Sequence, residues 1–304
     1  MKTMYSLFKT GGMRSPLCFL AAVVAALTFP STLSAKKAYA DSQGRLGLAG
    51  PPIANPAPGT YTGNCEAQAG NVYNCPGIKA GNKAPGLVDK SQAFAEAGDA
   101  AAVSGWSIRV AQGNGKLDVR TGVGAMATNT ETPAWGRAAV LDPWSFDDVA
   151  GDALDLVFGF DGVSLGAEGW ESFGNLTGFA GTNLPGLETL FNYSIVADGS
   201  QPEVLHLTFW SNPLLGIDDS AVIDLLAAAI LFDPATGGFS ADPAGFDFLS
   251  FQLQVPLDQP NLVLNWNLGA QASVVPEPST LAAGLAAAGL ALIQILRRRK
   301  KAGL

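Results

Sequence analysis

The sequence is poor in charged residues and nearly lacks histidine. Only 14% of its 304 residues are Asp, Glu, Lys or Arg, where a typical soluble domain has about a quarter. Its one histidine leaves few ways to build imidazole-based catalysis or the common zinc sites. With 36 glycines, 19 prolines and 48% hydrophobic residues, the composition is typical of an apolar, loop-rich exported protein.

Basic residues are missing from most of the chain. Residues 41–278 hold eight Lys and Arg against all 26 Asp and Glu, which gives them a net charge of −18. Residues 138–296 contain 19 acidic residues and no Lys or Arg. Phosphates would repel such a chain, so nucleic-acid binding is excluded as a function. The carboxylates of this region are therefore expected to be solvated, hydrogen-bonded or screened by cations.

One acidic cluster is a candidate calcium site. Calcium binds about six to eight oxygen atoms from Asp, Asn and backbone carbonyls, often on loops. No EF-hand or nonapeptide repeat occurs, and a diffuse acidic surface that opposes aggregation explains the composition without any cofactor. If a calcium site exists, its first candidate ligands are Asp147, Asp148, Asp152 and Asp155.

The N-terminus has the features of a secretory signal peptide. Basic residues precede an apolar stretch at residues 17–29, which is too short to span a bilayer comfortably. The small-x-small pattern at residues 38–40 predicts that signal peptidase removes residues 1–40, and a cut after Ala35 is the alternative. The chain is thus predicted to leave the cytoplasm through the secretion translocon.

Three elements follow one another at the C-terminus. A Pro-Glu-Pro motif within residues 275–280 precedes an apolar segment, 281–296, and a basic tail. As a transmembrane helix the segment would be about 24 Å long, and the positive-inside rule would keep the tail in the cytoplasm. The motif consists of Pro276, Glu277 and Pro278, and the tail of Arg297, Arg298, Arg299, Lys300 and Lys301.

This C-terminal series resembles the sorting signal of PEP-CTERM proteins, which are substrates of exosortase-type membrane proteases. The resemblance covers residues 275–301, and its motif matches the one that the protease recognises. It implies export into the periplasm of a Gram-negative-type bacterium and transient anchoring in the inner membrane. Cleavage near the motif and delivery to the cell surface or an exopolysaccharide matrix would follow. The resemblance implies nothing about the task of residues 41–274.

Residues 41–104 are rich in Gly, Ala, Pro and Asn, and this composition predicts a loop-rich arm. Cys65 and Cys75 remain as an even pair once Cys18 departs with the signal peptide, so we expect them to form a disulfide in an oxidising compartment. This bond would close a short loop and contribute roughly 3 kcal/mol. A short helix is predicted over residues 91–97.

From residue 105 to 274, short runs of β-branched and aromatic residues alternate with Gly, Asp, Asn and Pro. This pattern predicts a mainly β domain, an antiparallel β-sandwich of jelly-roll-like form. The stretch 221–232 is ambiguous, because Asp218 or Asp219 could cap a helix there, yet its neighbours are strands; we predict a strand. The other predicted strands are 106–110, 117–123, 154–160, 190–196, 204–210, 246–255 and 262–268.

Two classes of function fit these features. The sequence favours a noncatalytic structural or adhesive surface protein that contacts extracellular polysaccharide. Trp144, Trp170 and Trp210 are candidates for stacking on sugar rings, although Trp in a sandwich ordinarily packs in the core. The alternative is a secreted glycan-active hydrolase that uses paired carboxylates, and most of the acidic residues adjoin turn residues, where they supply backbone hydrogen bonds instead.

Overall fold

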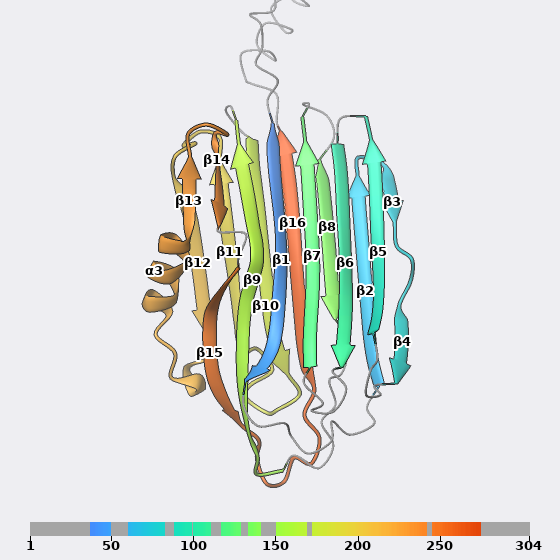
Figure 1. The fold of residues 1–304 in the computed structure, drawn as a ribbon, viewed down its shortest axis with the longest axis vertical. Coiled ribbons are helices and arrows are strands. Elements are labelled where there is room, and N and C mark those ends of the chain that lie inside the picture. Colours follow the sequence, from blue (N-terminus) through green and yellow to red (C-terminus); the bar gives the residue numbers. More distant parts are fainter. Residues whose placement is uncertain are drawn as a thin grey trace, which may run out of the picture. The chain divides into compact units, whose positions relative to one another are not determined.

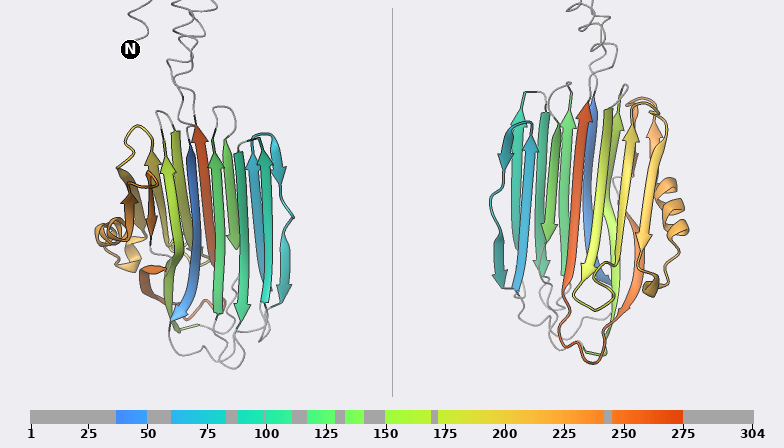
Figure 2. Two further views of the ribbon diagram at one scale, coloured as in Figure 1. Left: turned by 45° about the horizontal axis from the view of Figure 1, so that its top comes forward. Right: turned by 180° about the vertical axis from the view of Figure 1, so that it is seen from behind.

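Two antiparallel sheets pack face to face in the part of the chain that the structure describes (Figure 1). The computed structural model describes residues 37–49, 60–82, 88–98, 100–110, 117–128, 133–140, 150–168, 172–241 and 245–274. Within these ranges each sheet has eight strands. The predicted mainly β, antiparallel architecture is therefore confirmed, and Figure 2 shows both layers from two further directions.

The first sheet, sheet A, contains the strands that carry the candidate site. Its order is β13-β14-β9-β1-β7-β6-β5, and β15 pairs with the other half of β9. These strands are β1 (Ala38–Ala49), β5 (Val88–Ala97), β6 (Ala100–Val110), β7 (Leu117–Ala127), β9 (Ala153–Ala167), β13 (Ile230–Asp233), β14 (Gly238–Ala241) and β15 (Phe246–Gln254).

The second sheet, sheet B, has the order β12-β11-β10-β16-β8-β2-β3, and β4 also pairs with β2. All pairings in both sheets are antiparallel among the described strands. The strands are β2 (Thr60–Ala69), β3 (Val72–Asn74), β4 (Lys79–Asn82), β8 (Ala134–Val140), β10 (Ser172–Thr182), β11 (Phe191–Asp198), β12 (Leu205–Ser211) and β16 (Leu264–Val274).

The first and last strands of the sandwich lie in the middle of their sheets. β1 pairs with β7 on one edge and β9 on the other, and β16 lies between β10 and β8. Ala38 pairs with Ala167 at the end of β9, and Val274 pairs with Ser172 at the start of β10. The chain therefore enters and leaves the sandwich at the same end.

The core changes composition from one side of the sandwich to the other. On the side of β9–β12 and β15, aromatic rings pack together, with the Phe158 and Phe191 centroids 4.7 Å apart. On the side of β2, β5 and β6, the buried residues are mostly alanines, and the Trp106 ring lies against Gly63, where a Cβ atom would overlap it. Small residues thus let the two sheets approach closely on this side.

The described residues between 41 and 104 are part of the sandwich, which corrects the predicted arm. They contribute β1 to the middle of sheet A and β2 to sheet B, and the predicted domain boundary at 104/105 falls inside β6. The helix predicted over residues 91–97 is also wrong, since these residues belong to strand β5, which pairs with β6 along its whole length. Pairing with a neighbouring strand outweighs the helix propensity of Ala, Gln and Glu here.

The ambiguous stretch after residue 217 forms a helix, α3 (Asp219–Ala229), and not the predicted strand. The Asp218 carboxylate caps it by accepting hydrogen bonds from the backbone N–H groups of Ser220 and Ala221. Helical hydrogen bonds end at Ile230, where β13 begins. The helix follows a short 3₁₀ turn, Pro213–Leu215, and packs mainly against β12, the last strand of sheet B.

The two cysteines are free in the structure, which corrects the predicted disulfide. Cys65 is fully buried on the inner face of β2, where its Sγ lies 3.5 Å from Ser91 Oγ on the facing sheet. The Cys75 Sγ lies 3.5 Å from Oδ1 of Asn64, the residue that points to the opposite face of β2. The two thiols are therefore on different sides of one strand, and burial raises the pKa of the Cys65 thiol.

No helix in the described ranges is long and apolar enough to cross a membrane. The predicted transmembrane segment, 281–296, lies outside these ranges, as do the sorting motif and the basic tail. The apolar part of the predicted signal peptide lies outside them as well.

Strand β1 bears on where a signal peptidase would cut. A cut before Asp41 would remove Ala38, Tyr39 and Ala40, which pair with strands on both sides, and the two alanines are fully buried. The backbone carbonyl of Lys37 also accepts a hydrogen bond of 2.8 Å from the Glu168 N–H. The alternative cut, after Ala35, leaves all of these contacts in place.

We therefore expect exported protein to begin at Lys36, as N-terminal sequencing or intact-mass spectrometry would show. Removal of three residues from the middle of a sheet would leave backbone donors and acceptors of β7 and β9 without partners, at a cost of roughly 1–3 kcal/mol for each buried group. An N-terminus at Asp41 in folded, exported material would contradict this expectation.

Candidate functional site

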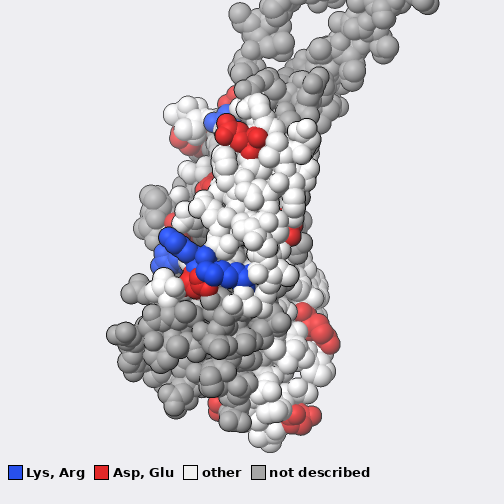
Figure 3. Space-filling view, turned by 90° about the vertical axis from the view of Figure 1, so that its right-hand side faces the viewer, with Lys and Arg blue, Asp and Glu red and all other residues white. Residues whose placement is uncertain are grey.

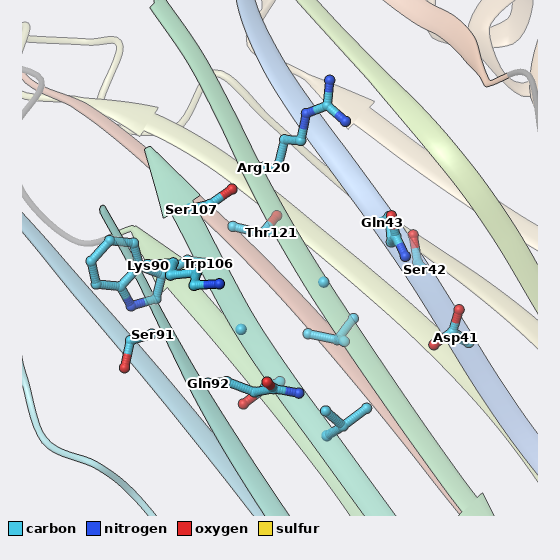
Figure 4. A pocket seen from close by; sticks show the side chains of 15 residues that line it. Asp41, Ser42, Gln43, Lys90, Ser91, Gln92, Trp106, Ser107, Arg120 and Thr121 are labelled. Atoms are coloured by element: carbon cyan, nitrogen blue, oxygen red, sulfur yellow. The ribbon is translucent and has the colours of Figure 1, made fainter. Parts of the chain in front are cut away.

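The outer face of sheet A carries a trough whose floor consists of backbone. Gly105 on β6 and Gly122 on β7 pair directly with each other, so two neighbouring strands lack side chains at the same level. The trough has a volume of about 520 Å³ and is open to solvent (Figure 4). Glycine inside a strand often marks a place where a ligand approaches the backbone, so this trough is the candidate site.

Polar side chains form the two walls of the trough. Gln43 on β1 pairs with Gly122, and Gln92 on β5 pairs with Gly105, so the two glutamines lie at the same level on opposite walls. Their backbones are three strand spacings apart, or about 14 Å. Figure 4 shows Gln43 on one side of the trough and Gln92 on the other. Amide groups on both walls can donate to and accept from the hydroxyls of a ligand.

Strand alternation creates this arrangement. The side chains next to the two glycines along their strands point into the core: Ser104, Trp106 and Thr121 are almost fully buried. The Ser104 hydroxyl donates to the Glu66 carbonyl at 2.8 Å, and the Thr121 hydroxyl accepts a hydrogen bond of 2.8 Å from Trp266 Nε1. These bonds tie sheet A to sheet B directly beneath the trough, which gives the floor a rigid support.

One end of the trough is apolar and closed by a carboxylate. Asp41 on β1 leans over Gly124, where a Cβ atom would lie 2.8 Å from its Oδ2 and 3.0 Å from the Val103 side chain. Beyond it lies a second hollow of about 210 Å³, whose lining includes Phe94 and Met126. Phe94, which is 51% exposed, presents an aromatic ring in this hollow.

Protein atoms around Asp41 displace part of the water near its carboxylate. Although the side chain remains exposed on one side, this desolvation raises the pKa of Asp41 above its usual value. Tyr39, two residues earlier on the same face of β1, has a raised pKa for the same dominant reason. The charged form of Asp41 is thus less favourable in the folded protein than in the unfolded chain.

The other end of the trough is basic. Arg120 on β7 and Lys90 on β5 line it, with Ser107 on β6 between them in the strand register. Nη1 of Arg120 lies 3.1 Å from Asp161 Oδ2 on β9, and more than half of the Arg120 side chain remains exposed. The trough therefore has a cationic end, an amide centre and an apolar, acidic end.

Arginines from the N-terminal part of the chain pair with carboxylates of the acidic region, which corrects the expectation that these acids lack such partners. Arg45 Nη2 lies 2.6 Å from Asp247 Oδ1, and its Nη1 lies 3.1 Å from Asp161 Oδ1. Arg120 contacts Asp161 as well. These pairs join β1, β7, β9 and β15 across the outer face of sheet A, next to the basic end of the trough.

The described part of the structure shows no calcium site built from the candidate ligands. Asp147 and Asp148 lie outside the described residues. Asp152 precedes β9, and Asp155 lies on β9, where its Oδ1 accepts a hydrogen bond of 3.1 Å from Gln252 Nε2. Among the described residues, no group of three or more His, Cys, Asp or Glu side chains is placed to hold a metal ion.

Residues 162–166 have the Gly-x-Ser-x-Gly spacing of a nucleophile elbow, but the structure places them inside an extended strand, β9. An elbow requires a sharp strand-to-helix turn that exposes the serine. Ser164 instead hydrogen-bonds the Tyr39 side chain. His206, the one histidine, is exposed on β12 of the other sheet. The described structure therefore places no histidine beside Ser164 that could act as its general base.

Of the three tryptophans predicted to contact sugars, one can be placed. Trp210 lies on β12 with 42% of its surface exposed, on the outer face of sheet B and away from the trough. Trp144 and Trp170 lie outside the described residues. The sequence analysis did not predict the trough residues. Glycines inside the β6 and β7 segments could have indicated a site where a ligand approaches the backbone. Only the strand register, however, places Gly105 beside Gly122.

Comparison of the chain with protein-family models, with curated protein sequences and with solved structures gives no match. The trough and its chemistry therefore carry the functional argument.

The desolvation of Asp41 has a testable effect on stability. Its raised pKa means that the folded state binds the proton more tightly, so stability falls as pH rises through the interval between the unfolded and folded pKa values. Asp41→Asn should therefore raise the melting temperature at pH 7 by about 1–3 °C, since solvent screening keeps the effect below about 1 kcal/mol. The difference should vanish at pH 3, where both proteins are neutral at this position. Thermal unfolding followed by circular dichroism would measure both.

Asp258→Asn, in the exposed turn after β15, is the matched control for the loss of one negative charge. If the two variants gain the same stability at pH 7, general charge repulsion and not the local environment of Asp41 would be the cause.

Proposed function

We propose that this protein is a noncatalytic surface or matrix protein whose sandwich binds extracellular polysaccharide in the trough on sheet A. The observation that carries this proposal is the paired floor of Gly105 and Gly122 between two walls of amide and charged side chains. A hollow of about 520 Å³ that is open to solvent suits a section of a polymer chain, because it does not have to enclose the whole ligand.

The charges around the trough favour binding over hydrolysis. A glycoside hydrolase ordinarily needs two carboxylates that flank the scissile bond. Among the described residues that line the trough, Asp41 supplies the one carboxylate. The neighbouring carboxylates of Asp161 and Asp247 are paired with arginines and do not line the trough. The hydrolase alternative therefore has less support.

We propose in addition that the C-terminal tail directs export and sorting. The tail resembles a PEP-CTERM signal, so an exosortase-type protease would be the processing partner, after the translocon and signal peptidase have acted. β16 ends at Val274, two residues before Pro276 of the motif. A cut at the motif would thus remove no residue of the sandwich. The predicted final location is the cell surface or the extracellular matrix.

Filling the trough tests the binding proposal. In Gly122→Val, the new Cβ would lie 3.8 Å from the Gln43 side chain, an ordinary contact, and valine favours a strand. The fold should therefore remain stable while the floor rises between the walls. We expect binding to the polysaccharide of the producing cells to fall at least about tenfold, which corresponds to 1.4 kcal/mol. Affinity electrophoresis or calorimetry would measure it.

Gly162→Val is the matched control. Gly162 lies on the same outer face, on β9, and pairs with Gln43 from the side away from the trough; a Cβ atom there meets nothing within 4 Å. Binding that is unchanged in Gly122→Val, or lost equally in both variants, would count against the trough as the binding site.

The sorting proposal is tested by replacing Pro276, Glu277 and Pro278 with alanines. The wild-type protein should be released without the residues after about position 280, whereas the variant should stay in the inner-membrane fraction with its C-terminus intact. Fractionation and mass spectrometry would show both. Alanines at Asp258, Gln259 and Pro260, in the loop after β15, provide a control of similar composition. Normal release of the motif variant would overturn this proposal.

A further inference from the structure

The cationic end of the trough has no counterpart elsewhere in its lining. In the strand register, Lys90, Ser107 and Arg120 lie in one row across β5, β6 and β7. The two basic side chains thus flank a hydroxyl, two strand spacings or about 10 Å apart at the backbone. The Lys90 side chain is long enough to bend toward a group bound above Ser107, and the Arg120 guanidinium, which contacts Asp161 through Nη1, adds positive charge on the other side. The row forms a cradle for one anionic group.

The surroundings make this cradle distinctive. All eight basic residues of the section 41–278 occur between residues 45 and 137. The charged residues from 138 to 278 are all acidic. Lys79 pairs with Asp89 at the neighbouring edge of the sandwich, and Arg45 pairs with Asp161 and Asp247. No described carboxylate pairs with the Lys90 ammonium. Figure 3 shows this edge, where basic side chains gather around an acidic one beside a mostly uncharged surface.

We propose that the trough selects polysaccharides that carry carboxylate or sulfate groups, with one such group held above Ser107 between Lys90 and Arg120. This inference rests on the proposed function and names its ligand class. A guanidinium matches the planar geometry of a carboxylate, and an ammonium adds a point charge. The Ser107 hydroxyl donates a third hydrogen bond from below.

The opposite end of the trough sets a second condition on the ligand. Asp41 lies about 13 Å from the cationic row along the strands, and its carboxylate repels another anion there. Phe94 and Val103 at the same end favour the apolar face of a sugar ring. A chain in which charged and neutral sugars alternate meets both conditions, because it can place an anionic group at one end and a neutral ring at the other.

The experiment uses the full chain and two polymers of the same backbone. One is a polysaccharide that alternates uronate with neutral sugars, and the other is its carboxyl-reduced form; a sulfated neutral polymer serves as a third probe. We expect the uronate and sulfated polymers to bind more tightly than the reduced one, and the preference to shrink as salt is raised, because exposed charges are screened.

Lys90→Gln should weaken binding of the uronate polymer by about two- to fivefold, the range typical of one exposed ion pair, and weaken binding of the reduced polymer less. Lys79→Gln is the matched control. It removes the same charge from the same edge of the sandwich, outside the residues that line the trough. Circular dichroism would verify that both variants are folded.

The possible outcomes separate this inference from the proposed function. Equal binding of the uronate and reduced polymers, or equal losses in Lys90→Gln and Lys79→Gln, would overturn the anion selectivity. If Gly122→Val still abolished binding in that case, the trough would remain the polysaccharide site. If no polymer bound, or if Gly122→Val bound them all normally, both proposals would be overturned.

Discussion

The pairing of β1 along both of its edges is the interaction on which the rest of the structure depends. This strand joins β7 to β9 and so connects the alanine-rich side of the sandwich to the aromatic side. Its inward residues contact the core, while its outward residues, Gln43 and Asp41, form one wall of the trough. Arg45, further along the same face, binds the carboxylates of β9 and β15. Fold, site and surface charge therefore share one strand.

The sequence predicted the strands with large apolar residues and missed those with small ones. Seven of the eight strands predicted after residue 105 fall on observed strands, because Leu, Val, Phe and Trp alternate there with polar residues; the eighth, 221–232, is mostly helix α3. β1 buries Ala38, Ala40 and Ser42, whose low hydrophobicity gives almost no period-two signal. β5 has the same weakness, and its Ala and Glu content favoured a helix. For α3 the capping residue Asp218 was visible, and neighbouring strands were the wrong reason to disregard it.

The candidate site shows a different limit of sequence reasoning. Polar residues in strands are ordinary on a solvated face, and glycine in a strand has several causes. Only the register between β5, β6, β7 and β1 brings two glutamines to one level across two glycines, and two basic residues to the next level. The acidic composition pointed toward calcium and away from basic groups. Two of the few basic residues, Lys90 and Arg120, line one end of the trough, so a minority of the charge defines the site.

The place of β16 has a consequence for the order in which the protein can fold. A chain that emerges N-terminus first, from a ribosome or a translocon, presents β16 last, yet this strand separates the two halves of sheet B. Until Val274 has emerged, β16 cannot complete its pairing with β10 and β8. The middle of sheet A, at β1 and β7, then lacks the strand of sheet B that packs against it. Most of the contacts span long sequence separations, which makes folding intrinsically slow. Under the proposed export, the chain would therefore complete its sandwich only after β16 has crossed the membrane.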